Sequence, residues 1–200
     1  IASCLVGSEM CIRDRTYTER QEEATSLDIT LHDPVMDTDL VLTYSVYEDY
    51  PVVTRSARLV QKGDQKIRLE NVMSAAVEFP DMDYEMIHLS GAWARERYVK
   101  TRKLEMGIQA VQSLAGTGSS SEQNPFIALK RPHTTEDTGE VFGFSFVYSG
   151  NFLAQVEVST YEMTRVMMGI NPQGFSWELS RDEEFQTPEV VMVYLSLIHI

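Results

Sequence analysis

The chain has 200 residues and a formal net charge of −13, from 17 Lys and Arg residues against 30 Asp and Glu residues. This acidic balance argues against nucleic acid and an anionic membrane as partners, because both are bound through positive potential. No apolar run in the sequence is long enough to span a bilayer as a helix. The length suits one domain with a substantial core.

The two ends of the chain share an origin that is not protein-like. The last six residues, LSLIHI (195–200), can be encoded by CTG TCT CTT ATA CAC ATC. The opposite strand, one base out of frame, encodes Met-Cys-Ile-Arg-Asp and begins an Arg codon, which matches MCIRDR at residues 10–15. One DNA element resembling the transposase end of a sequencing adapter therefore accounts for both. We expect residues 1–15 and 195–200 to be adapter-derived artefact, and residues 16–194 to be a domain that is incomplete at its N-terminus.

Removing these ends leaves no cysteine, because Cys4 and Cys11 both lie within residues 1–15. Residues 16–194 then offer no disulfide, thiolate metal site or cysteine nucleophile. A cysteine-free acidic domain fits a reducing compartment, and we expect a cytoplasmic location.

The pattern along residues 16–194 is typical of β-strands almost throughout. SLDITLHD (26–33) alternates between apolar and polar residues and is followed by Pro34. The next two alternating stretches are separated by EDYP (48–51), and similar short runs recur to FQTPEVVMVY (185–194). The predicted inward positions of the early strands are Tyr44, Val46, Val53, Ala57 and Leu59, with Thr43, Ser45, Arg55 and Arg58 among the polar alternates. The predicted fold class is all-β, an antiparallel sandwich with few or no helices.

One segment, residues 94–114, also fits an amphipathic helix. Gly107 interrupts that pattern, and the flanking sequence is rich in β-formers, so we predict strands there.

The strongest concentration of site-like chemistry is GAWARER (91–97). An indole such as that of Trp93 can cover the apolar C–H face of a sugar, while Arg95 and Arg97 could bond its hydroxyls. The alternative is a core tryptophan with a solvated Arg-Glu rim, and from residue types alone this alternative is favoured.

Other candidate groups have weaker patterns. Asp81, Asp83 and Glu85 would share one face of an extended strand and could hold calcium or act as an acid–base pair, but a solvated acidic turn is favoured. His88 and His133 lack metal-ligand spacing and are interpreted as structural. The Gly-rich loop AGTGSSSEQ (115–123) lacks the Lys-Ser/Thr of a phosphate loop and is expected to be a mobile surface loop. No catalytic set and no cofactor or metal site is predicted.

A resemblance adds to this. The segments RSARLVQKG (55–63), LSGAWARER (89–97), NPFIALKRP (124–132), GFSFVYSGNF (143–152) and TPEVVMVY (187–194) together closely resemble the N-terminal β-supersandwich domain of bacterial α-galactosidases of glycoside hydrolase family thirty-six. The resemblance covers nearly all of residues 16–194. Relatives carry a His in the loop before NPF. This chain departs from them with SSSEQ (119–123), so the resemblance does not extend to the contribution of this loop to packing or oligomer contacts.

The resemblance implies a parent enzyme that hydrolyses terminal α-linked galactose, as in melibiose and raffinose, with retention. Its two catalytic aspartates lie on a (β/α)8 barrel, one in a Lys-Trp-Asp motif that this sequence does not contain. The fragment is therefore expected to be inactive, and neither Asp81 nor Asp83 replaces them. The resemblance gives Trp93 a substrate contact, leaves Arg95 and Arg97 as possible supports of its loop, and implies a homotetramer. The alternatives are a stand-alone carbohydrate-binding or assembly module, and the same domain of an α-N-acetylgalactosaminidase.

Overall fold

The computed structural model of the chain describes residues 11–20, 24–116 and 122–196, the first of these ranges as backbone only. Every regular element in these ranges is a β-strand, and all strand pairs are antiparallel. The strands are β1 (Cys11–Arg20), β2 (Ala24–Asp33), β3 (Thr38–Tyr47), β4 (Val52–Gln61), β5 (Ile67–Leu69), β6 (Met73–Phe79), β7 (Glu85–Ala92), β8 (Arg95–Lys103), β9 (Gly107–Gln112), β10 (Gln123–Lys130), β11 (Glu140–Phe146), β12 (Phe152–Val158), β13 (Thr164–Ile170), β14 (Trp177–Leu179), β15 (Glu184–Gln186) and β16 (Val190–Ser196). Within the described residues no helix is long and apolar enough to cross a membrane.

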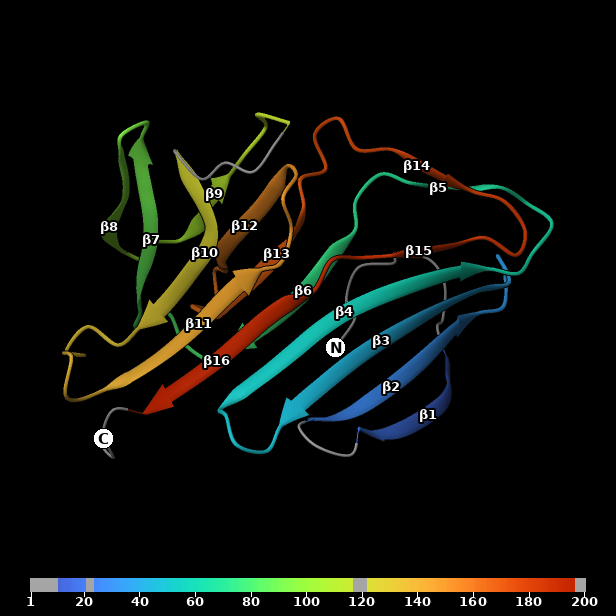
Figure 1. Ribbon diagram of the computed structural model, residues 1–200, viewed down its shortest axis with the longest axis horizontal. Helices are drawn as coiled ribbons and strands as arrows, with labels where there is room; N and C mark the ends of the chain where they lie inside the picture. Colours follow the sequence, from blue (N-terminus) through green and yellow to red (C-terminus); the bar gives the residue numbers. More distant parts are fainter. Residues whose placement is uncertain (1–10, 21–23, 117–121, 197–200) are drawn as a thin grey trace.

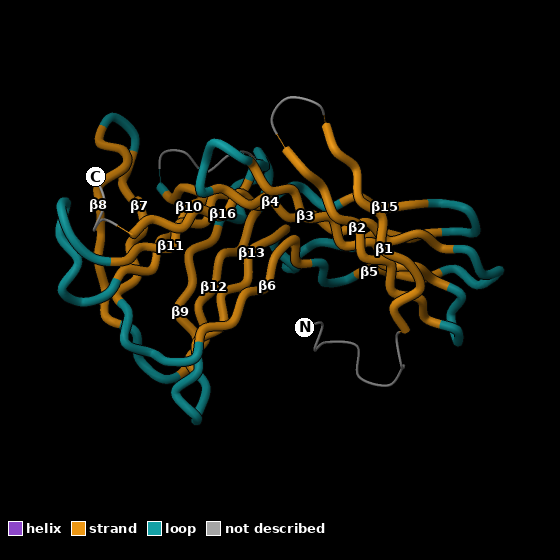
Figure 2. Tube along the Cα trace, turned by 90° about the horizontal axis from the view of Figure 1, so that it is seen from below, coloured by secondary structure: helices purple, strands orange, loops and turns teal. Residues whose placement is uncertain are grey.

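The strands form one long sheet, one small sheet and a short ribbon (Figure 1). The ten-stranded sheet has the order β1-β2-β3-β4-β16-β11-β10-β7-β8, with β15 also paired to β4. The four-stranded sheet has the order β6-β13-β12-β9, and β14 pairs with β5. Figure 2 shows the four-stranded sheet as a second layer under β10, β11 and β16, while β1–β3 extend beyond it. The all-β antiparallel prediction is confirmed, and so are strands within residues 94–114.

The core lies between the two layers because their facing strands alternate. In β12, the buried residues Phe152, Ala154, Val156 and Val158 alternate with half-buried ones, which is the pattern of a sheet with one face covered. They meet buried side chains of β7, β10, β11 and β16 from the long sheet, among them Met86, Ile127, Leu129, Phe144, Phe146 and Val190. Edge-to-face ring contacts join Phe79 with Tyr84 and Phe142. Met168 is fully buried, as expected of a packing residue.

The predicted inward positions of β3 and β4 are confirmed only in part. Ala57 is buried, but Val46 is 51% exposed, since it lies one residue from the end of β3. Arg55 was expected on the polar face, yet alternation places it on the same face as Val53 and Ala57. It reaches the second sheet, where its Nη1 atom donates to the Ala76 carbonyl over 3.0 Å.

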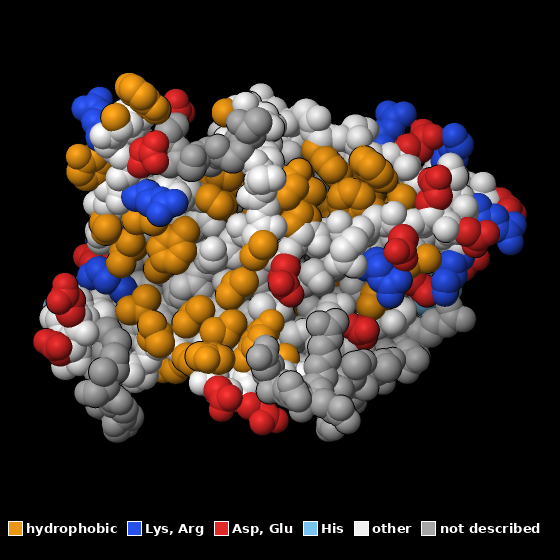
Figure 3. Space-filling model, viewed as in Figure 1, with side chains coloured by type: hydrophobic (Ala, Val, Ile, Leu, Met, Phe, Trp, Pro, Cys, Tyr) orange, Lys and Arg blue, Asp and Glu red, His pale blue; other side chains and the backbone are white. Residues whose placement is uncertain are grey.

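Charged side chains gather at the end of the molecule where β4, β5, β14 and β15 meet, while apolar side chains occupy the middle of the visible face (Figure 3). The charges there form exposed ion pairs, such as Lys66 with Glu178 and Arg58 with Glu184. Pairs of this kind contribute little to stability.

Both predicted adapter segments overlap strands. β1 starts at Cys11 and pairs with β2 through Cys11, Ile12, Asp14 and Arg15. β16 places Leu195 and Ser196 opposite Val141 and Glu140. Residues 1–10 and 197–200 lie outside the described residues. The adapter origin concerns the DNA that encodes these residues, and strand pairing does not test it. It therefore stays a prediction.

Candidate functional site

Trp93 lies at the tip of the β7–β8 hairpin. Ala92 pairs with Arg95, so Trp93 and Ala94 form a two-residue turn, and Ala94 has a positive φ of 65°. The Trp93 side chain is 86% exposed. The interpretation of Trp93 as a core residue is therefore wrong, because a turn tip at the edge of the long sheet offers it no packing partners. A large exposed indole on a short turn is a feature of binding surfaces.

Gly91 fixes the shape of this hairpin. The register shifts between Ser90 and Ala92, because β8 has one extra residue opposite Gly91, and Arg97 there has a φ of 60°. A Cβ atom at Gly91 would lie 2.3 Å from the Arg95 carbonyl oxygen. The Gly91 amide also donates to the Glu122 carbonyl over 2.9 Å. The bulge thus depends on a residue without a side chain at this position.

Arg95 and Arg97 are both exposed, like every other residue of β8. Neither has an ion-pair partner among the described residues. Their guanidinium groups are therefore available as donors at the base of the turn that carries Trp93. This hairpin can stack on an apolar surface and donate hydrogen bonds, but it holds no nucleophile with a base.

His88 lies buried beneath the same hairpin. The Arg102 Nη2 atom donates to His88 Nε2 over 2.8 Å, so Nε2 is an acceptor and the ring is neutral. Burial lowers the pKa of His88, and the charges of Arg102 and Lys100 lower it further, while the Gln123 side chain acts in the opposite direction. His88 is thus structural, as predicted.

We expect the free energy of unfolding to fall as the pH drops below about 6.5. Unfolded His88 takes up a proton near its ordinary pKa of 6.5, whereas folded His88 does so only at lower pH. The unfolded state therefore binds more protons in this range, and acid favours it. Urea unfolding between about pH 7 and pH 5 measures the slope. His88→Gln should flatten the slope, and equal slopes in the wild type and His88→Gln contradict the prediction.

The acidic residues 81–85 do not form one strand face, because Asp81 and Asp83 lie in the loop before β7. Asp81 accepts hydrogen bonds from Arg131 at 2.6 and 3.2 Å, and Arg131 holds the pKa of this carboxyl below its usual value. Glu85 pairs with Lys130 at 2.6 Å. Among the described residues no three His, Cys, Asp or Glu side chains are grouped to hold a metal ion. Asp81 and Glu85 therefore take part in ion pairs, while Asp83 is exposed in the loop, as a solvated acidic turn predicts.

Arg131 is the centre of that network and was not singled out from the sequence. It also bonds Glu140 over 3.2 Å and lies 3.9 Å above the ring of buried Tyr84. The partners are up to 50 residues away in the chain, so no local motif could have identified them. The Gly-rich loop contains residues 117–121, which lie outside the described residues, so its predicted mobility stays a prediction.

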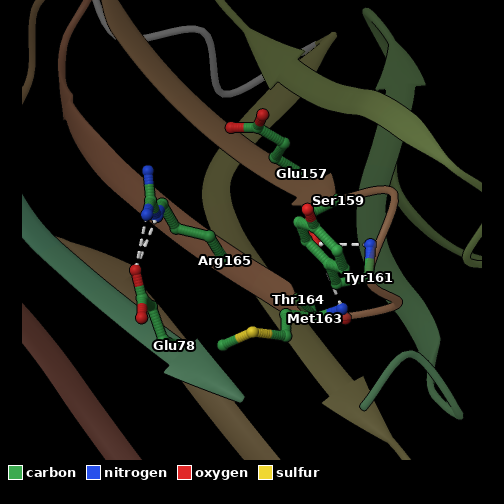
Figure 4. A pocket seen from close by; sticks show the side chains of 7 residues that line it. All are labelled: Glu78, Glu157, Ser159, Tyr161, Met163, Thr164 and Arg165. Carbon is green, nitrogen blue, oxygen red and sulfur yellow. Dashed lines mark hydrogen bonds and ion pairs between the residues drawn. The ribbon is translucent and has the colours of Figure 1, made fainter. Parts of the chain in front are cut away.

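A second set of residues missed from the sequence lines a hollow of about 230 Å³ on the four-stranded sheet. It is formed by Glu78, Glu157, Ser159, Tyr161, Met163, Thr164 and Arg165 (Figure 4). These side chains come from β6, β12, β13 and the turn between β12 and β13. The only local signal was the aromatic residue in STYEMT (159–164), which has no neighbouring ligand pattern.

Comparison with known proteins decides the family of the chain. Residues 13–180 match the family model described as the glycosyl hydrolase family 36 N-terminal domain. The chain belongs to this family. The match covers the hairpin with Trp93, the Arg131 network and the hollow with Tyr161.

Relatives of this family 36 domain include α-galactosidase AgaA of Geobacillus stearothermophilus, with 52% identity over 90% of the chain. α-Galactosidase 1 of Pediococcus pentosaceus is 43% identical over 89% of the chain. The chain spans 24% of the length of both relatives. A crystal structure of AgaA matches 94% of the chain and 28% of its own length, with a TM-score of 0.91 and 44% identity. Crystal structures of AgaA variants in complex with raffinose and with stachyose match equally well.

Proposed function

We propose that the chain is the non-catalytic N-terminal domain of an α-galactosidase that hydrolyses terminal α-linked galactose from raffinose, melibiose and related oligosaccharides with retention. The observation that carries the proposal is its 52% identity to an α-galactosidase over 90% of its length. The raffinose and stachyose complexes of that relative support the substrate class. The catalytic pair of carboxylates belongs to a part of the enzyme that these 200 residues do not contain.

The contribution of this domain to the sugar site is Trp93. Its ring is exposed on a short turn whose backbone is held by the bulge at Gly91, so it can be presented to a sugar with little loss of conformational freedom. Arg95 and Arg97 are placed to support the turn or to donate to sugar hydroxyls. The domain also supports assembly of a cytoplasmic homotetramer, which sedimentation velocity on the full-length enzyme tests directly.

In the full-length enzyme, we expect Trp93→Ala to lower kcat/KM for raffinose and melibiose by about tenfold or more, since stacking on the galactose ring is lost. Initial rates of galactose release measure the effect. Trp93→Phe should retain part of the activity, because it keeps an aromatic face. Trp177→Ala is the matched control, since Trp177 is half exposed in β14 and packs on Phe185 instead.

Unchanged kcat/KM in Trp93→Ala removes Trp93 from the sugar site without affecting the proposed enzyme class. The enzyme class has its own test. The full-length reading frame must encode a Lys-Trp-Asp motif downstream of residue 194, and the enzyme must cleave p-nitrophenyl α-galactoside faster than the corresponding N-acetylgalactosaminide.

A further inference from the structure

The hollow on the four-stranded sheet is built by strand register. On the face turned away from the core, Glu78 of β6 and Glu157 of β12 both pair directly with Arg165 of β13. Arg165 and Glu78 form an ion pair, because the Arg165 Nε and Nη2 atoms donate to Glu78 Oε1 at 3.0 and 2.5 Å. The Arg165 guanidinium is thereby held by the Glu78 carboxylate, and Glu157 lies opposite it on the other neighbouring strand.

Tyr161 and Met163 form the apolar rim of this hollow. Tyr161 is 86% exposed and Met163 is 43% exposed. Figure 4 shows Tyr161 and Glu157 on one side of the hollow and the Arg165–Glu78 pair on the other, with Met163 between them. No other aromatic ring among the described residues contacts Tyr161.

The turn that carries Tyr161 is well fixed by hydrogen bonds. The Ser159 Oγ atom accepts from the amides of Tyr161 and Met163, each over 3.3 Å. The Ser159 amide donates to the Met163 carbonyl over 2.9 Å, and Glu162 has a positive φ of 60°. An exposed ring on such a turn loses little backbone freedom when it binds a ligand.

The chemistry of the hollow selects the ligand class. Two carboxylates and one guanidinium leave a net negative charge, which disfavours phosphates and other anions. The apolar rim is too small and open to bury a hydrophobic side chain. A pyranose ring fits, because its C–H face can cover the Tyr161 ring and Met163 while its hydroxyls donate to Glu157 and accept from Arg165. The volume of about 230 Å³ accommodates one sugar unit.

We propose that the hollow formed by Tyr161, Met163, Glu157 and the Arg165–Glu78 pair is a carbohydrate-binding site for one unit of a neutral oligosaccharide. It lies on the four-stranded sheet, whereas Trp93 lies at the edge of the long sheet, so the two positions bind independently. This proposal does not require the chain to be part of an α-galactosidase. Its test is therefore independent of the test of the function proposed above.

The test uses the 200-residue chain and nuclear magnetic resonance titration with raffinose, galactose and glucose. We expect saturable amide shifts confined to residues 157–165 and Glu78, with a millimolar Kd for at least one sugar. Tyr161→Ala should weaken this binding about tenfold, and Glu157→Gln should weaken it less. Tyr50→Ala is the matched control, because Tyr50 is also an exposed tyrosine in a turn, at 67%.

Three results would overturn the proposal. The first is the absence of saturable shifts with all three sugars, and the second is equal weakening by Tyr161→Ala and Tyr50→Ala. The third is a set of shifts at residues 157–165 that follows protein concentration rather than sugar, which would identify the hollow as a contact between copies of the chain. Tyr161→Phe, which keeps the ring, should bind like the wild type and guards against a folding defect in the alanine variant.

Discussion

Phe152→Ala is expected to lower the free energy of unfolding by about 3–5 kcal/mol. The Phe152 side chain is 1% exposed and lies in β12, which is an inner strand of the four-stranded sheet. Its removal loses the burial of an aromatic side chain and leaves a cavity between two layers that are each held by paired strands, so the site can collapse only in part. The Phe152 carbonyl accepts hydrogen bonds from the Ser113 amide and the Asn171 side chain, and neither bond involves the side chain that is removed.

Urea unfolding followed by far-ultraviolet circular dichroism measures this loss, with Tyr50→Ala as the control. Tyr50 is 67% exposed, so its removal should change the free energy of unfolding by less than about 0.5 kcal/mol. For a domain whose total stability is of the order of 5–15 kcal/mol, the Phe152 variant loses a large fraction of it. A loss below about 1 kcal/mol would mean that the core lies elsewhere.

Gly91→Val is expected to lower the free energy of unfolding by about 3 kcal/mol and to displace the turn that carries Trp93. The new Cβ atom would lie 2.3 Å from the Arg95 carbonyl oxygen and 2.8 Å from the Glu96 Cα atom. Both are backbone atoms of β8, so no side-chain rotation relieves the overlap. The bulge must open, and the Trp93 fluorescence should change with it.

Gly143→Ala is the matched control, since it introduces a Cβ atom into another strand of the same sheet. That atom would lie 3.9 Å from the Val193 Cβ atom and 4.0 Å from the Phe126 ring, which are ordinary contacts. It should therefore cost little. If the two glycine variants have the same stability, the close approach at Gly91 does not govern the hairpin.

Strand positions were predictable where the alternation of the sequence matches burial in a two-layer sandwich. β12 is the clearest case, because its apolar residues at positions 152, 154, 156 and 158 are all buried in the core. The prediction was wrong at Val46 and Arg55, where position near a strand end and contact with the second sheet override residue type. Local patterns do not contain that information.

The candidate site residues also divide into those that local sequence can indicate and those that depend on contacts between distant strands. Trp93 was singled out through the GAWARER motif (91–97), although residue types alone favoured a core tryptophan and only the family resemblance suggested a sugar contact. Its exposure followed only from the turn between β7 and β8. Arg131 and the hollow around Tyr161 could not be found, because pairing across strands far apart in sequence brings their partners together. A contact that depends on register is invisible until the register is known.

The position of β16 has a consequence for synthesis of the domain on the ribosome. The strand of residues 190–196 comes last in the described chain, yet it lies between β4 and β11 in the middle of the long sheet. Until it emerges, strands β1–β4 form one part of the long sheet and strands β7, β8, β10 and β11 form another, with no strand to join them. β15, the other partner of β4 on that side, is also late in the chain. Two unpaired edges are open to other chains during that interval. Nascent chains of this domain therefore need shielding until the central strand closes the sheet.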